Sequence, residues 1–171
     1  MREVITLTEP DFLEISRCLF DKGVGVRFQA KGWSMRPFIK NGDFITVKPI
    51  ENSSIKTGDV VFYSTAENKV VIHRVIKKYK KNITKVFLIK GDAASGFPEI
   101  INVKNVFGKV VEIERRGRTK RLESKSYKVI NLFLSGISPF SHRIYPLGSR
   151  VKKRGRKIFG TLLKELKSLK E

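Results

Sequence analysis

The chain has 171 residues, of which 40% are hydrophobic and 30% are charged, and its formal net charge at pH 7 is +20. This length and composition are typical of one globular domain with a hydrophobic core, and they exclude two large domains or a disordered chain. The excess of Lys and Arg predicts attraction to polyanions, either nucleic acid or anionic lipid headgroups, and the single cysteine excludes an internal disulfide or a cysteine zinc site.

The sequence shows neither the pattern of a secretory signal nor that of a membrane-spanning helix. A signal needs a basic start and an unbroken apolar run, but acids stand at Glu3, Glu9 and Asp11. A spanning helix needs about 20 consecutive apolar residues, and the nearest candidate, residues 129–147, is interrupted by proline, histidine and arginine. We therefore expect a cytoplasmic protein, in solution or peripheral at the membrane.

A short amphipathic helix is predicted within residues 1–23. Thr8 is a good N-cap, Pro10 suits the first turn, and Gly23 closes the segment. Apolar residues recur at helical spacing, namely Phe12, Ile15 and Leu19. Cys18 stands among apolar neighbours, and we expect its thiol to be buried in the core.

Residues 24–126 are predicted to form a mainly β domain. Short runs rich in Val, Ile and Phe alternate with turn residues, and they cover residues 24–30, 44–48, 59–64, 69–76, 85–90 and 106–113. Six or more strands joined by turns indicate an antiparallel or mixed sheet of barrel type. Gly-Asp pairs at 42–43, 58–59 and 91–92 stand at such turns. Five basic residues within 115–121 predict an exposed basic hairpin or a strand edge protected by charge.

Residues 127–171 are predicted to be a basic C-terminal extension with an amphipathic helix from about Ser149. Its apolar residues fall on one helical face, and lysine and arginine fill the rest. Such a helix can lie in the interface of an anionic membrane. The alternatives are a helix packed on its own domain or on a partner helix, and we expect nucleic acid to be the least suitable partner.

The string G-W-S-M-R-P-F-I-K-N-G-D at residues 32–43 carries the most chemical information. It places Ser34 after a predicted strand, and it is followed in order by V-V-F-Y-S at 60–64, V-I-H-R-V at 71–75, K-G-D-A-A at 90–94 and V-F-G-K-V at 106–110. Together these strings resemble the type I signal peptidases and LexA-like serine peptidases of the S24 and S26 groups, over residues 24–113. The resemblance implies the β fold of that group and Ser34 as a nucleophile.

The residue before Arg74 decides which branch of the group is most similar. Bacterial signal peptidases and LexA-like proteins use a lysine base, whereas the archaeal and endoplasmic-reticulum type has a histidine there, as in His73-Arg74-Val75. The chain thus resembles the Ser/His type without its transmembrane anchor. A neutral imidazole can take the proton of a serine hydroxyl near neutral pH, which a lysine can do only after desolvation.

The resemblance leaves the third member of the site open. A histidine base usually needs a group that fixes its tautomer, and Asp92 is our first candidate, with Glu99 as the alternative acid. A pair without an acidic partner is a further alternative. The amide of Ser34 is the natural oxyanion donor, because Gly32 and Trp33 offer no side-chain hydroxyl.

We therefore expect a serine endopeptidase of the signal peptidase I-like group that cleaves a peptide or precursor protein without a cofactor or metal. Two alternatives remain. One is a LexA-like self-cleaving regulator, which should carry a lysine base and an N-terminal DNA-binding domain for which the residues before 24 leave no room. The other is a non-catalytic basic β module that binds anionic lipid or nucleic acid.

Overall fold

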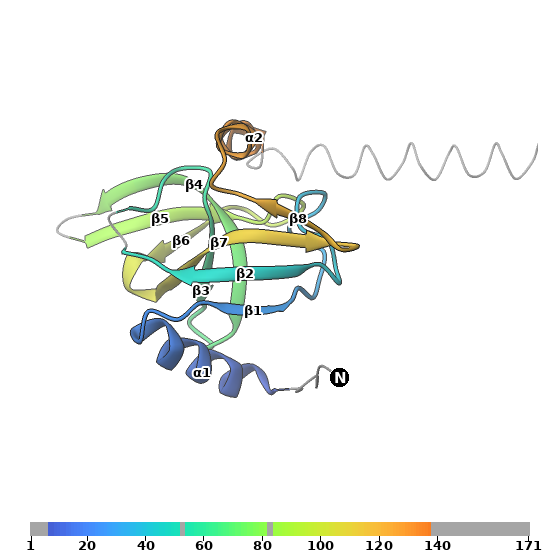
Figure 1. Ribbon diagram of the computed structural model, residues 1–171. Coiled ribbons are helices and arrows are strands. Elements are labelled where there is room, and N and C mark those ends of the chain that lie inside the picture. Colours follow the sequence, from blue (N-terminus) through green and yellow to red (C-terminus); the bar gives the residue numbers. More distant parts are fainter. Residues whose placement is uncertain (1–6, 52–53, 82–83, 138–171) are drawn as a thin grey trace, which may run out of the picture.

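The structure, a computed structural model, describes residues 7–51, 54–81 and 84–137 (Figure 1). These residues form a mainly β fold, which confirms the predicted class. Its elements are α1 (Glu9–Asp21), β1 (Val26–Gln29), β2 (Phe44–Pro49), β3 (Val60–Ser64), β4 (Val70–Lys81), β5 (Thr84–Lys90), β6 (Glu99–Asn102), the 3-10 turn η1 (Val103–Asn105), β7 (Val106–Arg115), β8 (Arg118–Arg121) and α2 (Lys125–Ile137). The predicted helix after Ser149 lies outside the described residues.

All strand pairs of the sheet are antiparallel. The strand order is β1-β2-β7-β3-β4-β5-β6, and β8 pairs with β7. The long strand β4 pairs with β3 over Val70–Arg74 and with β5 from Arg74 onward, with a register shift between Val75 and Lys77. Figure 1 shows α1 beside β1 and α2 at the opposite side of the molecule.

Strand β3 is buried on both faces and separates two hydrophobic clusters. Val60 and Phe62 belong to the cluster that α1 covers, whereas Val61 and Tyr63 belong to a second cluster with Val75. Because successive side chains of a strand alternate between faces, a strand between two clusters needs a continuous apolar run. This explains why the sequence of β3 has no polar alternation.

Helix α1 begins where the sequence predicts, but it buries a different face. The Thr8 side chain accepts a hydrogen bond from the Asp11 amide at 3.4 Å. Rings of α1 and the sheet then pack edge to face, including Phe12 on Phe28 and Phe20 on Phe62. This packing turns Cys18 to the solvent, so the prediction of a buried thiol is wrong.

The basic segment forms the β7–β8 hairpin, which confirms an exposed basic hairpin. Arg116 and Gly117 at its tip both have positive φ, at 52° and 73°, as a tight two-residue hairpin turn requires. All four residues of β8 are exposed. Among the described residues no helix is both long and apolar enough to cross a membrane.

Candidate active site

Ser34 lies on the loop between β1 and β2, and its neighbours anchor that loop. Met35 is buried in the α1 cluster, and its carbonyl accepts a hydrogen bond from the Ile39 amide at 2.9 Å. The Asn41 side chain accepts one from the amide of Gly32 at 3.0 Å. Ser34 itself is exposed, so the loop presents the serine to solvent from a backbone that is fixed on both sides.

Asp43, at the end of this loop, fastens the loop to β7. Its carboxylate accepts hydrogen bonds from Arg115 at 2.8 and 2.6 Å and from the Lys40 amide at 2.8 Å. Burial raises the pKa of Asp43, but Arg115 and the Lys40 amide outweigh burial and hold that pKa below its ordinary value. Arg115 also donates to the Phe38 carbonyl at 2.9 Å. Asp43 thus gives the loop that carries Ser34 a fixed position.

Gly91 brings Ser34 and His73 together. A Cβ placed on Gly91 would lie 3.0 Å from both the Ser34 Cβ and the His73 Nε2, and 2.7 Å from the Ser34 carbonyl oxygen. The Ser34 and His73 atoms are therefore separated by at most twice 3.0 Å. The Ala93 amide also donates to the Ser34 carbonyl at 2.7 Å. Only a residue without a side chain allows the segment after β5 to close over this pair.

Within the described residues, the hydroxyl and the amide of Ser34 take part in no hydrogen bond. In free enzymes the bond between nucleophile and base is often long and tightens only when substrate binds. The amide of Ser34 has no internal partner among the described residues and can donate to an incoming oxygen. Trp33, next to the serine, is exposed and stacks under the Arg36 guanidinium at 3.7 Å from its ring centroid.

His73 is held as a neutral imidazole beside residues of the second hydrophobic cluster. Its cross-strand neighbour is Val61, and burial lowers the pKa of the imidazole to about 4. At neutral pH the ring is therefore uncharged. Its Nδ1 lies 3.1 Å from the Tyr63 hydroxyl oxygen, and its Nε2 faces Gly91 and Ser34.

Tyr63 connects His73 to an acid. Burial raises the pKa of Tyr63 well above its ordinary value, and the nearby Glu99 carboxylate raises it further. The hydroxyl thus keeps its proton, and with that proton turned toward Glu99 its oxygen can accept a hydrogen bond from Nδ1–H of His73. This arrangement favours the tautomer whose Nε2 lone pair faces Ser34.

The Asp92 carboxylate, our first candidate for the partner of His73, is bound by Arg74, and no hydrogen bond joins it to His73 among the described residues. Its carboxylate accepts hydrogen bonds from Nε and Nη2 of Arg74, each at 2.7 Å. Arg74 follows His73 on β4 and therefore points to the other face of the sheet, where its cross-strand partner is Lys90. The alternative acid, Glu99, approaches His73 only through Tyr63.

Tyr63 belongs to this site but was not predicted from the sequence. Tyr63 pairs with Val71, two residues before His73, so the two side chains share one face of the sheet. Only the register of β3 on β4 reveals this neighbourhood, because a tyrosine in an apolar strand is otherwise an ordinary core residue.

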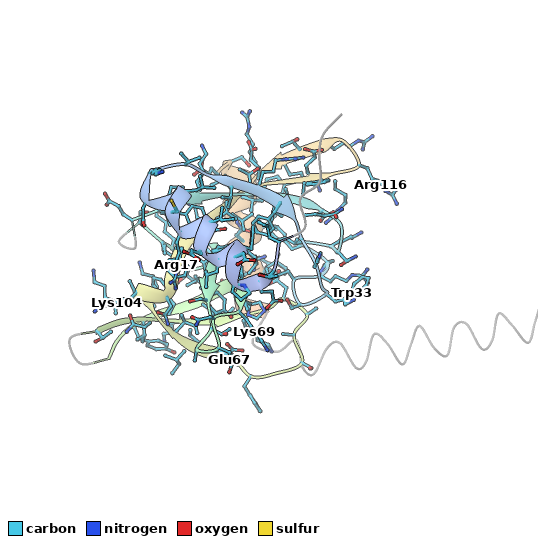
Figure 2. The ribbon with its side chains drawn as sticks, turned by 90° about the horizontal axis from the view of Figure 1, so that it is seen from below. Arg17, Trp33, Glu67, Lys69, Lys104 and Arg116 are labelled. Carbon is cyan, nitrogen blue, oxygen red and sulfur yellow. The ribbon has the colours of Figure 1, made fainter. Side chains whose placement is uncertain are left out.

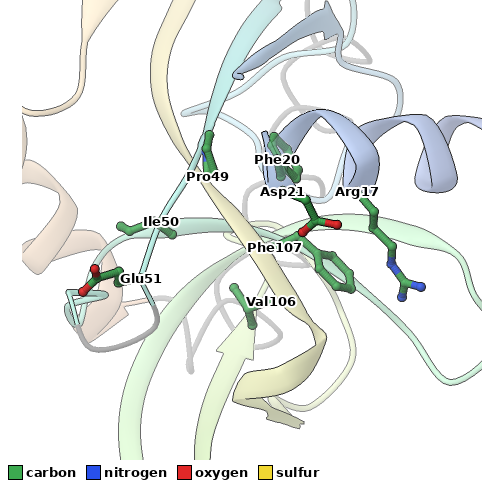
Figure 3. A pocket seen from close by; sticks show the side chains of 8 residues that line it. All are labelled: Arg17, Phe20, Asp21, Pro49, Ile50, Glu51, Val106 and Phe107. Atoms are coloured by element: carbon green, nitrogen blue, oxygen red, sulfur yellow. The ribbon is translucent and has the colours of Figure 1, made fainter. Parts of the chain in front are cut away.

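The candidate site lies at the end of the sheet that carries the basic hairpin. Figure 2 shows Trp33 and Arg116 on the same side of the molecule, with Lys104 on the opposite side. An open groove of about 440 Å³ lies elsewhere, between α1, the end of β2 and the start of β7 (Figure 3). It is lined by Arg17, Phe20, Asp21, Pro49, Ile50, Glu51, Val106 and Phe107 and contains no residue of the candidate site.

A serine hydroxyl beside a neutral, oriented imidazole on a β scaffold is typical of serine hydrolases. The family model described as Peptidase S24-like matches residues 5–111, more than half of the chain, and the protein belongs to this family of serine peptidases and LexA-like self-cleaving proteins. The match contains Ser34, Tyr63, His73 and Glu99 and ends before β8 and α2. No match was found among curated proteins or solved structures.

Proposed function

We propose that the protein is a serine endopeptidase of the signal peptidase I-like group, with Ser34 as nucleophile and His73 as general base. The observation that carries the proposal is the approach of Ser34 and the His73 Nε2 to the same point above Gly91. The lowered pKa of His73 keeps the imidazole neutral at physiological pH, so its Nε2 can accept a proton, although a base of this pKa is weaker than an ordinary histidine.

In this mechanism Nε2 of His73 takes the proton of the Ser34 hydroxyl while the serine oxygen attacks a peptide carbonyl. The Ser34 amide donates a hydrogen bond to the resulting oxyanion. The C–N bond then breaks, His73 passes its proton to the leaving amine, and water hydrolyses the ester with His73 again as base. Tyr63 accepts from Nδ1–H throughout and, with Glu99, stabilises the imidazolium.

A histidine at the base position favours the Ser/His signal peptidase type over the lysine-dependent branches. From that likeness we infer an extended peptide or precursor protein as substrate, with small side chains before the cleaved bond. Asp92 has a structural function in this proposal, since Arg74 occupies its carboxylate.

A fluorophosphonate probe tests the nucleophile directly, because it forms a covalent bond only with an activated serine. We expect the wild type and a Ser54→Ala control, which alters another exposed loop serine, to be labelled, and Ser34→Ala to remain unlabelled with a melting temperature within a few degrees. Equal labelling of all three proteins, or of none, would argue against the proposal.

Self-cleavage is a second candidate, favoured by membership of a family with LexA-like members. Purified wild type would then shorten at a rate that does not depend on its concentration, and the Ser34→Ala variant would stay intact. An endopeptidase acting in trans would cleave the Ser34→Ala chain only if that chain carries a substrate site. Salt-sensitive binding to lipid or nucleic acid without any hydrolysis would favour the non-catalytic β module.

A further inference from the structure

Helix α2 has an inverted distribution of polar and apolar side chains. Asn131 and Ser135 are buried against the domain, at 5% exposure each. Large apolar side chains face outward, with exposures of 69% for Val129, 42% for Ile130, 60% for Leu132 and 66% for Phe133. We name these four residues the α2 apolar face. A helix on a water-soluble domain normally has the opposite arrangement.

The contacts of α2 with the domain fix this orientation. Asn131 accepts a hydrogen bond from Nη1 of the buried Arg74 at 2.9 Å. Gly58, with φ at +93°, lies so close that a Cβ there would come within 2.9 Å of the Asn131 backbone. Tyr127 packs against the cluster under α1. Turning the α2 apolar face inward would break the bond to Arg74 and leave a buried guanidinium with one acceptor fewer, which is costly.

The α2 apolar face is a contiguous hydrophobic surface with no cover among the described residues. Each such side chain gains about 1.5–3 kcal/mol when it is fully buried. Exposed apolar patches of this kind on soluble domains mark protein or membrane contacts.

The positive charge of the chain indicates which kind of partner contacts the α2 apolar face. A second copy of the chain carries the same net charge of +20, which disfavours self-association. Residues 122–124 join α2 directly to the exposed basic strand β8, and the sequence after α2 is again rich in Lys and Arg. Apolar side chains flanked by cations fit the interface of an anionic bilayer, where the former enter the acyl boundary and the latter meet the headgroups.

We propose that the α2 apolar face is a membrane-docking surface that seats the protein on anionic lipid. The proposal does not depend on catalysis by Ser34. It also differs from binding through the basic C-terminal residues alone, because it assigns the apolar contribution to four defined side chains of α2.

Cosedimentation of the full chain with vesicles tests this surface. We expect binding to vesicles of phosphatidylcholine with 30% phosphatidylglycerol, weak binding to pure phosphatidylcholine, and loss at high salt. The double variant Leu132→Ser with Phe133→Ser should bind at least about tenfold more weakly, since two buried apolar side chains are lost. The matched control Val24→Ser with Ile100→Ser also removes exposed apolar residues and should bind within twofold of wild type.

A fluorescence experiment distinguishes the other possible occupants. Phe133→Trp in a Trp33→Phe background should show a blue shift of emission only when anionic vesicles are added. A shift already present without lipid would mean that another part of the chain covers the face. A dimer in solution that the Leu132→Ser, Phe133→Ser variant abolishes would mean that a second copy does so. Either result, or equal vesicle binding by the two double variants, would overturn the proposal.

Discussion

The Tyr63 hydroxyl lies between the candidate base and the Glu99 carboxylate, and its removal should leave His73 without a partner at Nδ1. We expect Tyr63→Phe to lower kcat by at least about tenfold, part of the 10²–10⁴ that a general base supplies, with a much smaller change in KM. Tyr79→Phe on β4, where the ring is partly exposed, is the matched control. An unchanged kcat together with an unchanged ¹⁵N tautomer signal of His73 would show that Tyr63 only packs.

The acid limb of the pH profile depends on burial of His73. Its pKa is lowered to about 4, and the base must be neutral to act. Activity should therefore be level above about pH 6 and fall only as the pH approaches 4, whereas an unburied histidine would give a limb near its ordinary value of about 6.5. Measurement of kcat/KM or of the probe labelling rate between pH 3.5 and 8 distinguishes the two.

Asp92 should matter for stability more than for chemistry. Arg74 has no exposed surface and its guanidinium lies over the Phe38 ring at 4.5 Å. Asp92→Asn removes the charge that compensates it, so we expect a loss of about 3–5 kcal/mol in the free energy of unfolding, measured with urea. The exposed Glu67→Gln should change it by less than about 0.5 kcal/mol. If Asp92→Asn is instead inactive and fully stable, Asp92 acts in the site.

At the scale of elements, the segment between β5 and β6 closes the site, and two of its glycines differ sharply. Gly91→Ala would place a Cβ against the Ser34 carbonyl and the His73 ring. We expect this to lower the free energy of unfolding by about 1–3 kcal/mol. It should also lower kcat/KM by up to about a hundredfold, because Ser34 and His73 are displaced from each other. Gly96→Ala has no atom within 4 Å of its Cβ and should be silent. Equal activity of both variants would show that Gly91 does not set the Ser34–His73 distance.

The long strands could be predicted from the sequence because their Val, Ile and Phe runs are bounded by glycine turns. Strand β4 was expected to end at residue 76 but continues to Lys81, because its last residues are mostly lysines and do not show the apolar pattern of a strand. Strand β6, with only four residues, was not predicted. Helix α2 was not predicted either, because a helix with its polar residues buried lacks the usual pattern.

The candidate pair Ser34 and His73 could be inferred from the order of the sequence motifs. The neighbours of His73 could not be inferred in this way, because they depend on which strands pair and in which register. Asp92 was the first candidate because it stands in the Gly-Asp turn after β5. Successive side chains of β4 alternate between faces, so Arg74 contacts Asp92 whereas His73 contacts Tyr63. Such choices are made by strand register, on which a single sequence carries little information.

For the molecule as a whole, burial of a neutral histidine should make stability depend on pH. The native pKa of His73 is lowered to about 4 and the unfolded value is about 6.5, so the unfolded chain binds more protons between these values. This contribution is present above pH 6.5 and is lost as the pH falls toward 4, by about 3 kcal/mol. Chemical denaturation should show a smaller acid loss for His73→Gln than for wild type. Parallel curves would contradict the burial of the ring.

Strand β3 contributes side chains to both hydrophobic clusters. We therefore expect that disruption of the packing in one cluster also disturbs the other. Phe62 contacts rings on the α1 side, while its neighbour Tyr63 reaches the imidazole on the other side. The stability of the candidate site is therefore expected to depend on the packing of α1. Thermal unfolding is expected to be a single cooperative transition. Substitutions that destabilise the packing of α1 should also reduce proton transfer between Ser34 and His73.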